Sequence, residues 1–333
     1  MTLITSISGI RGTIGGIVGD SLSPVDIVRF TTAYANFIKS TRNNIVSNNE
    51  YKNTIVIGRD ARISGLMVRN IVSGVLMSCG LNVKDLGLST TPTVEMAVIL
   101  EKAAGGIIIT ASHNPKQWNA LKLLNNKGEF LSNEDGNKIL SFAKKEKYLY
   151  SKVDFLGNYI KIDNYNDIHI NKILNLSLVD VDLIKSAKFK VVLDAVNSTG
   201  GIIIPQLLNK LGVQCIKLYC EPNGKFPHNP EPLPENLVEI SNLVVKKRAD
   251  LGIVVDPDVD RLAFICEDGS MFGEEYTLVA VSDYVLQNTP GNTVSNLSST
   301  QALKDITEKY DCEYNTSAVG EVNVVQKMKE TNA

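Results

Sequence analysis

Two polar stretches of the sequence follow apolar runs and carry side chains suited to phosphate and metal chemistry. The first, TASHNP, comes directly after the β-branched run GGIII and contains Ser112 and His113. A strand that ends in a polar loop places this loop at the carboxyl edge of a sheet, where ligands gather in α/β proteins. Lys116 and Lys122 follow, and such cations suit a serine that carries a phosphate. An ordinary turn is the alternative, since Ser, Asn and Pro are common in turns.

A serine hydrolase is a competing interpretation of Ser112. The sequence contains no G-x-S-x-G nucleophile elbow, and only His113, His169 and His228 are available as histidine bases. Because His113 is the next residue in the chain, we expect its ring to point away from Ser112. We therefore discount a hydrolase.

The second stretch, DPDVDR, places three carboxylates at alternating positions, so that they can converge on one side of an extended loop: Asp256, Asp258 and Asp260. Three carboxylates without His or Cys suit Mg²⁺ or Ca²⁺ rather than Zn²⁺. Arg261 stands where an EF-hand loop needs glycine, and the flanking LGIVV and RLAFIC are typical of strands, which excludes that motif. A solvated acidic turn is the alternative, but close carboxylates repel one another unless a cation neutralises them.

Two further segments could bind phosphate or could simply be structural, and a third is expected to be structural. SGIRG brings Arg11 into a glycine-rich loop, and GRDARISG brings Arg59 and Arg62 to a strand end. Arg59 and Arg62 could equally form an ion-pair network with Asp60. The proline-rich segment 221–237 is predicted to be an ordered loop without chemistry of its own.

A repeated strand–loop–helix unit positions these loops. It occurs at 53–80, 189–212 and 291–310, each time as a β-branched strand, a polar loop and a helix of period 3.6. Gly80 and Gly212 are expected to end the first two helices, and Ser64 is a candidate N-cap. Strands that alternate with helices favour parallel or mixed sheets. We therefore expect three related α/β domains that face a shared cleft.

The expected domain limits are 1–150, 151–268 and 269–333. The polar stretch from 143 to 190 is interpreted as a connection with a solvated surface helix. The last domain is small, and the segment YNTSAVGEVNVV in it is expected to begin a strand.

Composition narrows the classes of protein. A formal net charge of −2 excludes a basic nucleic-acid footprint and a polybasic membrane patch. Five cysteines without C-x-x-C spacing favour reduced thiols over a zinc site or a disulfide framework. Neither a signal peptide nor an apolar run of about 20 residues is present, so we expect a cytoplasmic protein without membrane or nucleic-acid partners.

Taken together, SGIRG, GRDAR-SG, TASHNP, FPHNPEPLPENL and DPDVDR resemble the α-D-phosphohexomutases, over essentially the whole chain. The resemblance implies an α/β fold, in which related domains with mixed sheets follow one another along the chain and surround a central cleft. It also implies an enzyme that moves a phosphoryl group between O6 and O1 of a hexose phosphate. The family has four domains, and its sugar-recognition loop would follow soon after Ala333. The sequence therefore resembles a C-terminally truncated member, with domain III incomplete and the fourth domain absent.

The resemblance also implies roles for the site residues. Ser112 would be the phosphoserine, and one Mg²⁺ would be bound by its phosphate together with Asp256, Asp258 and Asp260. A hexose bisphosphate would be the intermediate and activator.

Four other residues would serve the transfer. Lys122 and His113 would assist proton transfer and orient the phosphate, and Arg11 and Arg261 would contact the transferring group and the substrate. These roles agree with phosphoryl transfer, in which the protein mainly positions groups and neutralises charge.

Glu321 stands where phosphomannomutase-type members often carry histidine. A carboxylate near an amino sugar favours glucosamine 6-phosphate and glucosamine 1-phosphate as the substrate pair, with phosphomannomutase or phosphoglucomutase activity as the alternative. Binding energy from the distal phosphate supports catalysis, so the chain alone is expected to be weakly active. An inactive phosphosugar-binding remnant is the alternative from another class, and the protein is expected to be a monomer or homodimer.

Overall fold

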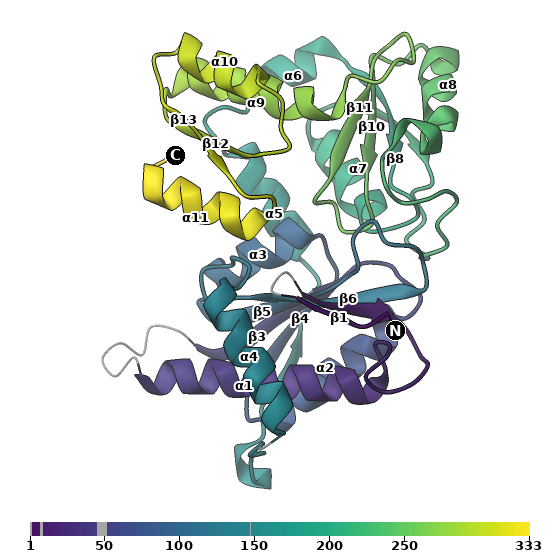
Figure 1. Cartoon of the computed structure of the whole chain (residues 1–333). Coiled ribbons are helices and arrows are strands. Elements are labelled where there is room, and N and C mark those ends of the chain that lie inside the picture. Colours follow the sequence, from purple (N-terminus) through teal and green to yellow (C-terminus); the bar gives the residue numbers. More distant parts are fainter. Residues whose placement is uncertain (1, 7–8, 45–51, 147) are drawn as a thin grey trace.

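The computed structural model describes residues 2–6, 9–44, 52–146 and 148–333. Three sheets of seven, four and two strands organise these residues into three α/β units. In Figure 1 the first unit lies at the bottom, the green second unit lies at the upper right, and the yellow third unit lies at the upper left. The expected tandem α/β fold with mixed sheets is confirmed.

The first unit is built on a mixed sheet of order β1-β2-β6-β5-β3-β4-β7. β3, β4 and β5 run parallel, whereas β6 is antiparallel to both of its neighbours. Its elements are β1 (Ile4–Ser6), β2 (Gly9–Thr13), α1 (Pro24–Asn44), β3 (Lys52–Arg59), α2 (Gly65–Ser78), β4 (Asn82–Leu88), α3 (Thr91–Leu100), β5 (Ala103–Ile109), β6 (Trp118–Leu124), α4 (Asn133–Lys145), a 3₁₀ turn (Val153–Phe155) and β7 (Tyr159–Lys161).

Both faces of this sheet are covered, which explains why its central strands are continuous apolar runs. Ile57 and Ile109 belong to a core with α1, α2 and α4, whereas Val56 and Ile108 belong to a core with α3. Figure 1 shows α1, α2 and α4 on one side of the sheet and α3 on the other side, toward the upper units. The buried β5 thus delivers the chain to the carboxyl edge at Thr110.

The second and third units are smaller. The second sheet has the order β11-β10-β8-β9, in which only β11 is antiparallel, and the third is the parallel pair β12-β13. Their elements are α5 (Tyr165–Leu174), α6 (Val181–Ala187), β8 (Lys190–Asp194), α7 (Gly200–Lys210), β9 (Gln214–Leu218), a 3₁₀ turn (Pro234–Asn236), α8 (Val238–Lys247), β10 (Leu251–Val255), β11 (Leu262–Ile265), α9 (Glu274–Asn288), β12 (Thr293–Asn296), α10 (Ala302–Lys309), β13 (Tyr314–Ser317) and α11 (Glu321–Thr331).

The three repeated strand–loop–helix units are confirmed as β3–α2, β8–α7 and β12–α10. Gly80 and Gly212 follow the first two helices with φ of 79° and 69°, a conformation that favours glycine. Ser64 occupies the predicted N-cap position of α2. Its hydroxyl makes no cap bond and instead accepts a hydrogen bond from Asn119 Nδ2 at 2.9 Å.

Two other segments differ from expectation. The stretch read as a solvated connection contributes the edge strand β7, which pairs with β4, and α5, whose Tyr165 and Ile170 are buried. The strand expected to begin with YNTSAVGEVNVV is only β13, because Gly320 at a φ of 117° precedes α11. The domain limits at 150 and 268 stay a prediction. Within the described residues, every helix is too short or too polar to cross a membrane.

Candidate active site

Ser112 lies in the loop after β5 and faces the acidic loop of the second unit. It is 9% exposed, and its Oγ donates a hydrogen bond to Asp256 Oδ2 at 2.7 Å, with Asp260 Oδ1 at 3.4 Å. The expectation that His113 points away is wrong, because its Nδ1 lies 3.3 Å from Ser112 Oγ. Ser112 has a φ of 47°, and this left-handed turn breaks the alternation that an extended chain would give. The structure therefore groups the serine, the imidazole and the carboxylates.

The three aspartates follow β10 and converge as the sequence predicts. One ligand oxygen from each lies within 4.8 Å of the others, and Asp256 and Asp258 are fully buried. Asp258 Oδ1 is buried and accepts no hydrogen bond from any part of the chain that the structure describes. A buried carboxylate oxygen without a partner, within a set of oxygen donors alone, fits a hard divalent cation. The triad could therefore bind a metal ion.

Helix α3 holds this acidic loop from the first unit. Thr91 donates to Asp258 twice, from its backbone nitrogen to the backbone oxygen at 2.8 Å and from Oγ1 to Oδ2 at 2.6 Å. The second contact leaves Oδ1 as the carboxylate oxygen of Asp258 that remains for a cation. Thr91 is not among the residues predicted from the sequence, because a threonine at the start of a helix is ordinary.

Lys122 and the neighbouring aspartates shift one another's pKa values. Burial raises the pKa of Asp256 well above its usual range, and the neighbouring Asp258 and Asp260 raise it further. Burial would also raise the pKa of Asp258, but Lys122 outweighs it and lowers this pKa. Lys122 Nζ lies 2.8 Å from both Asp258 Oδ2 and Asp260 Oδ2, and the two carboxylates raise its pKa against the effect of burial. Without a cation, the site therefore disfavours the charged form of Asp256 more than the charged form of Asp258.

The two predicted arginines, Arg11 and Arg261, both lie close enough to His113 for their charges to lower its pKa. Arg261 donates from its backbone to Asp256 Oδ1 at 3.2 Å, and its Nη1 lies 3.1 Å from Glu231 Oε1. Arg11 lies on β2 opposite Ala120, and its buried Nε has no hydrogen-bond partner among the described residues. Ser8 of the SGIRG segment lies outside those residues.

The surroundings of His113 favour its neutral form. Burial lowers its pKa, and the positive charge of Arg261 lowers it further, with a smaller effect of Arg11. A neutral imidazole can accept a proton at neutral pH, which suits a group 3.3 Å from the serine oxygen.

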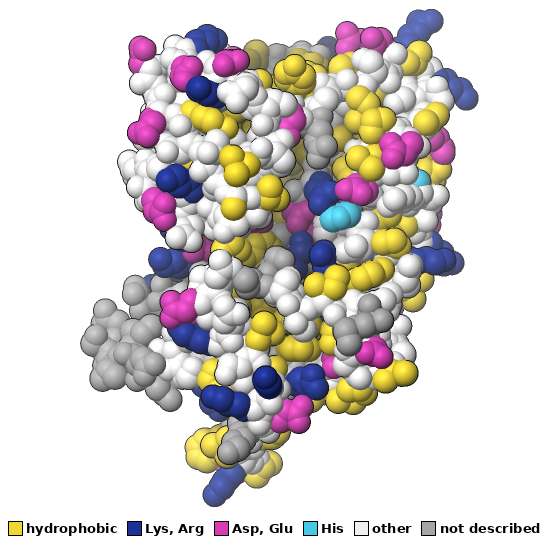
Figure 2. Space-filling model, viewed as in Figure 1, with side chains coloured by type: hydrophobic (Ala, Val, Ile, Leu, Met, Phe, Trp, Pro, Cys, Tyr) yellow, Lys and Arg dark blue, Asp and Glu magenta, His cyan; other side chains and the backbone are white. Residues whose placement is uncertain are grey.

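A cavity of about 370 Å³ joins the three units at this point. Figure 2 shows a hollow between the lower and upper parts of the molecule, with basic, acidic and histidine side chains gathered at it. The third unit contributes Glu321 at the start of α11, and burial and the charge of Asp260 raise the pKa of this carboxyl. The predicted residues that line the cavity are Ser112, Lys122, Asp260, Arg261 and Glu321.

The sheets and the site together define a protein built from α/β/α domains around a cleft, with a serine and three aspartates after strand ends and a lysine on β6 beside them. Comparison with known proteins agrees and is more specific. The family models of phosphoglucomutase/phosphomannomutase α/β/α domains I, II and III match residues 4–149, 167–269 and 273–333. The chain belongs to the phosphoglucomutase/phosphomannomutase family, whose members are phosphohexomutases.

Three relatives illustrate the match. A phosphoglucomutase/phosphomannomutase of Thermococcus kodakarensis is 32% identical, over 96% of this chain and 69% of its own length. A phosphoglucosamine/phosphogalactosamine mutase of Sulfurisphaera tokodaii is 29% identical, over 96% of this chain and 68% of its own. A phosphomannomutase/phosphoglucomutase of Pseudomonas putida is 32% identical, over 84% of this chain and 58% of its own. These relatives are thus named for different sugars.

The fold is shared with a solved phosphoglucomutase/phosphomannomutase family protein from Burkholderia thailandensis. The TM-score is 0.82 at 22% identity, and the match covers 99% of this chain and 70% of that chain.

Proposed function

We propose that Ser112 carries the phosphoryl group of a phosphohexomutase that interconverts 6-phosphorylated and 1-phosphorylated hexoses. The observation that supports this most is the position of Ser112 Oγ, 2.7 Å from Asp256 and beside a carboxylate triad that Lys122 bridges. With a divalent cation held by the triad, such a set would offset negative charge at one oxygen, which is what phosphoryl transfer requires of the protein.

The proposed transfer runs in two balanced steps. A sugar hydroxyl oxygen bonds to the phosphorus of phospho-Ser112 while the bond from phosphorus to Ser112 Oγ breaks, which gives a hexose bisphosphate. The bisphosphate then returns its other phosphoryl group to Ser112 Oγ, so the phosphate has moved between O6 and O1. In the first step His113, close to Ser112 Oγ, would take the proton of the sugar hydroxyl and pass it to Ser112 Oγ as the bond to phosphorus breaks. In the second step it would take this proton from Ser112 Oγ and pass it to the sugar oxygen that leaves.

The remaining residues would hold charge. Asp256, Asp258 and Asp260 would hold Mg²⁺, which when bound offsets the negative charge of the phosphoryl oxygens. Lys122 would keep Asp258 and Asp260 oriented, while Arg11 and Arg261 would bind the phosphate of the sugar.

We propose glucosamine 6-phosphate and glucosamine 1-phosphate as the substrate pair. Glu321 lies in the wall of the cavity with Ser112, and a carboxylate there favours a cationic amino group on the sugar. The phosphoglucosamine/phosphogalactosamine mutase among the relatives supports this choice, whereas the relatives named for mannose and glucose support the alternative. The bisphosphate activator, the cytoplasmic location and a monomeric or dimeric state stay predictions.

The test is conversion of glucosamine 6-phosphate in the presence of Mg²⁺ and glucosamine 1,6-bisphosphate. Ser112→Ala should abolish turnover without changing the melting temperature by more than a few degrees, because the hydroxyl is the phosphoryl carrier. Ser186→Ala, which removes a hydroxyl on the exposed side of α6, is the matched control and should retain the rate. Wild-type turnover by the Ser112→Ala chain would exclude the proposal, and a wild-type chain that binds the sugar phosphate without turnover would favour the binding remnant.

A further inference from the structure

We propose that Arg62 is a positioning residue that holds the Ser112 loop in its reactive conformation, and that Phe226 of the second unit completes this clamp. The inference rests on the proposed function for its catalytic consequence, but its structural part stands on the contacts alone. Sequence analysis left Arg62 as a member of a possible ion-pair network and gave the proline-rich segment no role.

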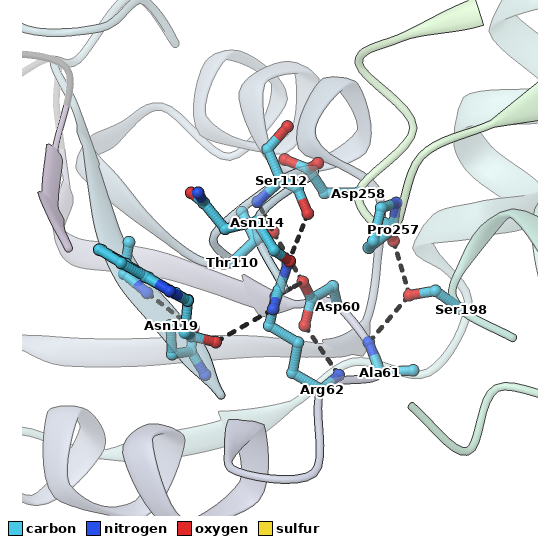
Figure 3. A network of polar contacts seen from close by, with 12 residues as sticks. Asp60, Ala61, Arg62, Thr110, Ser112, Asn114, Asn119, Ser198, Pro257 and Asp258 are labelled. Atoms are coloured by element: carbon cyan, nitrogen blue, oxygen red, sulfur yellow. Dashed lines mark hydrogen bonds and ion pairs between the residues drawn. The ribbon is translucent and has the colours of Figure 1, made fainter. Parts of the chain in front are cut away.

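The guanidinium of Arg62 binds the backbone of the loop that carries Ser112. Its side chain is fully buried, and it donates to four backbone carbonyl oxygens, as Figure 3 shows in part. Nη2 donates to the oxygens of Ser112 and Asn114 at 2.5 and 2.6 Å, and Nη1 donates to those of Pro115 and Trp118 at 2.8 and 3.1 Å. The planar fork of an arginine can serve four acceptors at once, whereas a lysine ammonium cannot.

Asp60 anchors the guanidinium and continues the network back to Ser112. Arg62 Nε lies 3.0 Å from Asp60 Oδ2, and the Arg62 backbone nitrogen donates to Oδ1 at 2.9 Å. The same Oδ2 accepts from Thr110 Oγ1 at 2.7 Å, and Thr110 Oγ1 accepts from the Ser112 backbone nitrogen at 3.0 Å. The backbone oxygen and the backbone nitrogen of Ser112 are thus both linked to the buried ion pair of Arg62 and Asp60, the nitrogen through Thr110 (Figure 3).

This anchoring is needed because the backbone of Ser112 is strained. A φ of 47° puts a non-glycine residue in the left-handed region, which costs about 1 kcal/mol or more and persists only when the surroundings enforce it. That turn aims Oγ at Asp256 and brings His113 beside it. Loss of the four carbonyl contacts would let the loop relax and move Oγ away from the triad.

Residues of the second unit also contact Arg62 and the neighbouring Ala61. The ring of Phe226 covers the Arg62 guanidinium, 5.1 Å from its centroid, and Gly224 approaches Ala61 so closely that a Cβ there would lie 2.1 Å from the Ala61 oxygen. Ser198 Oγ accepts from the Ala61 nitrogen at 3.2 Å and donates to the Pro257 oxygen at 2.7 Å. The turn of Arg62 therefore contacts the proline-rich segment directly and reaches the acidic loop through Ser198, so it connects the serine loop with the loop of the aspartates.

The test compares the full 333-residue chain with three single variants. Arg62→Lys keeps the charge but loses most carbonyl contacts, and Phe226→Leu keeps an apolar cover but loses the aromatic face. Arg69→Lys is the matched control, because Arg69 also pairs with a buried aspartate, Asp85, at 3.1 Å and also lies over an aromatic ring.

Two readouts separate positioning from general stability. Amide hydrogen exchange over residues 110–119 should rise about tenfold or more in Arg62→Lys and several-fold in Phe226→Leu, with no rise in Arg69→Lys. Phosphorylation of Ser112 by glucose 1,6-bisphosphate, followed by intact mass, should slow at least tenfold in Arg62→Lys while the half-saturating bisphosphate concentration stays unchanged.

Unchanged exchange over 110–119 in both Arg62→Lys and Phe226→Leu would overturn the inference, and so would an equal rise in Arg69→Lys. If Arg62→Lys does not fold, Phe226→Leu decides. A wild-type chain that takes no phosphoryl group from the bisphosphate would contradict the proposed function, while the exchange data would still decide whether the clamp exists.

Discussion

Lys122 Nζ lies 2.8 Å from the Asp258 carboxylate and 2.8 Å from the Asp260 carboxylate. It thus joins β6 of the first unit to the acidic loop of the second unit. Lys122 is on β6, four residues after the Trp118 carbonyl that Arg62 binds. The ammonium compensates part of the negative charge of the triad, which also faces Ser112. We therefore expect Lys122 to affect both the stability of the fold and the reaction at Ser112.

Lys122→Met should therefore destabilise the chain when no metal is present. Removal of the ammonium leaves the buried Asp258 carboxylate without its cation, at a cost of about 3 kcal/mol in the free energy of unfolding. Because the triad then carries more uncompensated charge, the rise in melting temperature on adding Mg²⁺ should be larger than in the wild type. Urea unfolding in EDTA and thermal scans with Mg²⁺ would measure both effects, and a variant as stable as the wild type in EDTA would refute this reading.

Asp256→Asn should have the opposite sign in EDTA. Burial and two adjacent carboxylates raise the pKa of Asp256, so a neutral amide there relieves repulsion and should raise the melting temperature by a few degrees. The same change removes a ligand, so the Mg²⁺-dependent rise should nearly vanish. Asp311→Asn is a suitable control, since Asp311 is exposed at a φ of 56° that asparagine tolerates. Full retention of the Mg²⁺ effect in Asp256→Asn would contradict the assigned metal site.

Glu95 on α3 should make stability fall as pH rises. Its pKa is raised to about 8, chiefly by burial and next by the charge of Glu321. The folded chain holds this proton up to about pH 8 and the unfolded chain releases it near pH 4.5, so the contribution is complete below pH 4.5 and is lost as pH rises toward 8. One proton gives a slope of at most about 1.4 kcal/mol per pH unit.

Glu95→Gln should flatten this slope between pH 5 and pH 8 when unfolding is measured in EDTA. An unchanged slope in the variant would show that Glu95 ionises normally in the folded chain.

Glu321→Gln should reduce the preference for an amino sugar. Loss of the carboxylate in the cavity wall should lower kcat/KM for glucosamine 1-phosphate by about tenfold, with little change for mannose 1-phosphate. Glu330→Gln, on the exposed end of the same helix, is the control. An equal loss for both sugars in Glu321→Gln would assign Glu321 to a role other than sugar selection.

The sequence predicted those parts of the site that follow strands. Ser112 follows β5 of the first sheet and Asp256 follows β10 of the second, so each could be expected at the carboxyl edge of its own sheet. Their proximity was expected only because the domains were predicted to face a shared cleft. The strand–helix units were equally visible, since their apolar spacing reflects burial on both faces of a sheet.

Other parts could not be predicted because their partners are backbone atoms or depend on a single turn. The acceptors of Arg62 are carbonyl oxygens, which every residue has, so no pattern of side chains marks them. The direction of His113 follows from the left-handed backbone at Ser112, which residue types alone do not indicate. The three residues of β7 are all exposed, so they carry no alternation that would mark a strand.

The most direct test of the central claim is to follow a single phosphoryl group that starts on Ser112. The chain would be labelled there from radiolabelled glucose 1,6-bisphosphate, freed of sugar, and mixed with glucosamine 6-phosphate and Mg²⁺ in a rapid-quench experiment. We predict that the label leaves the protein and appears on a sugar bisphosphate at a rate at least as fast as turnover. Label that stays on Ser112 while product accumulates would contradict the account.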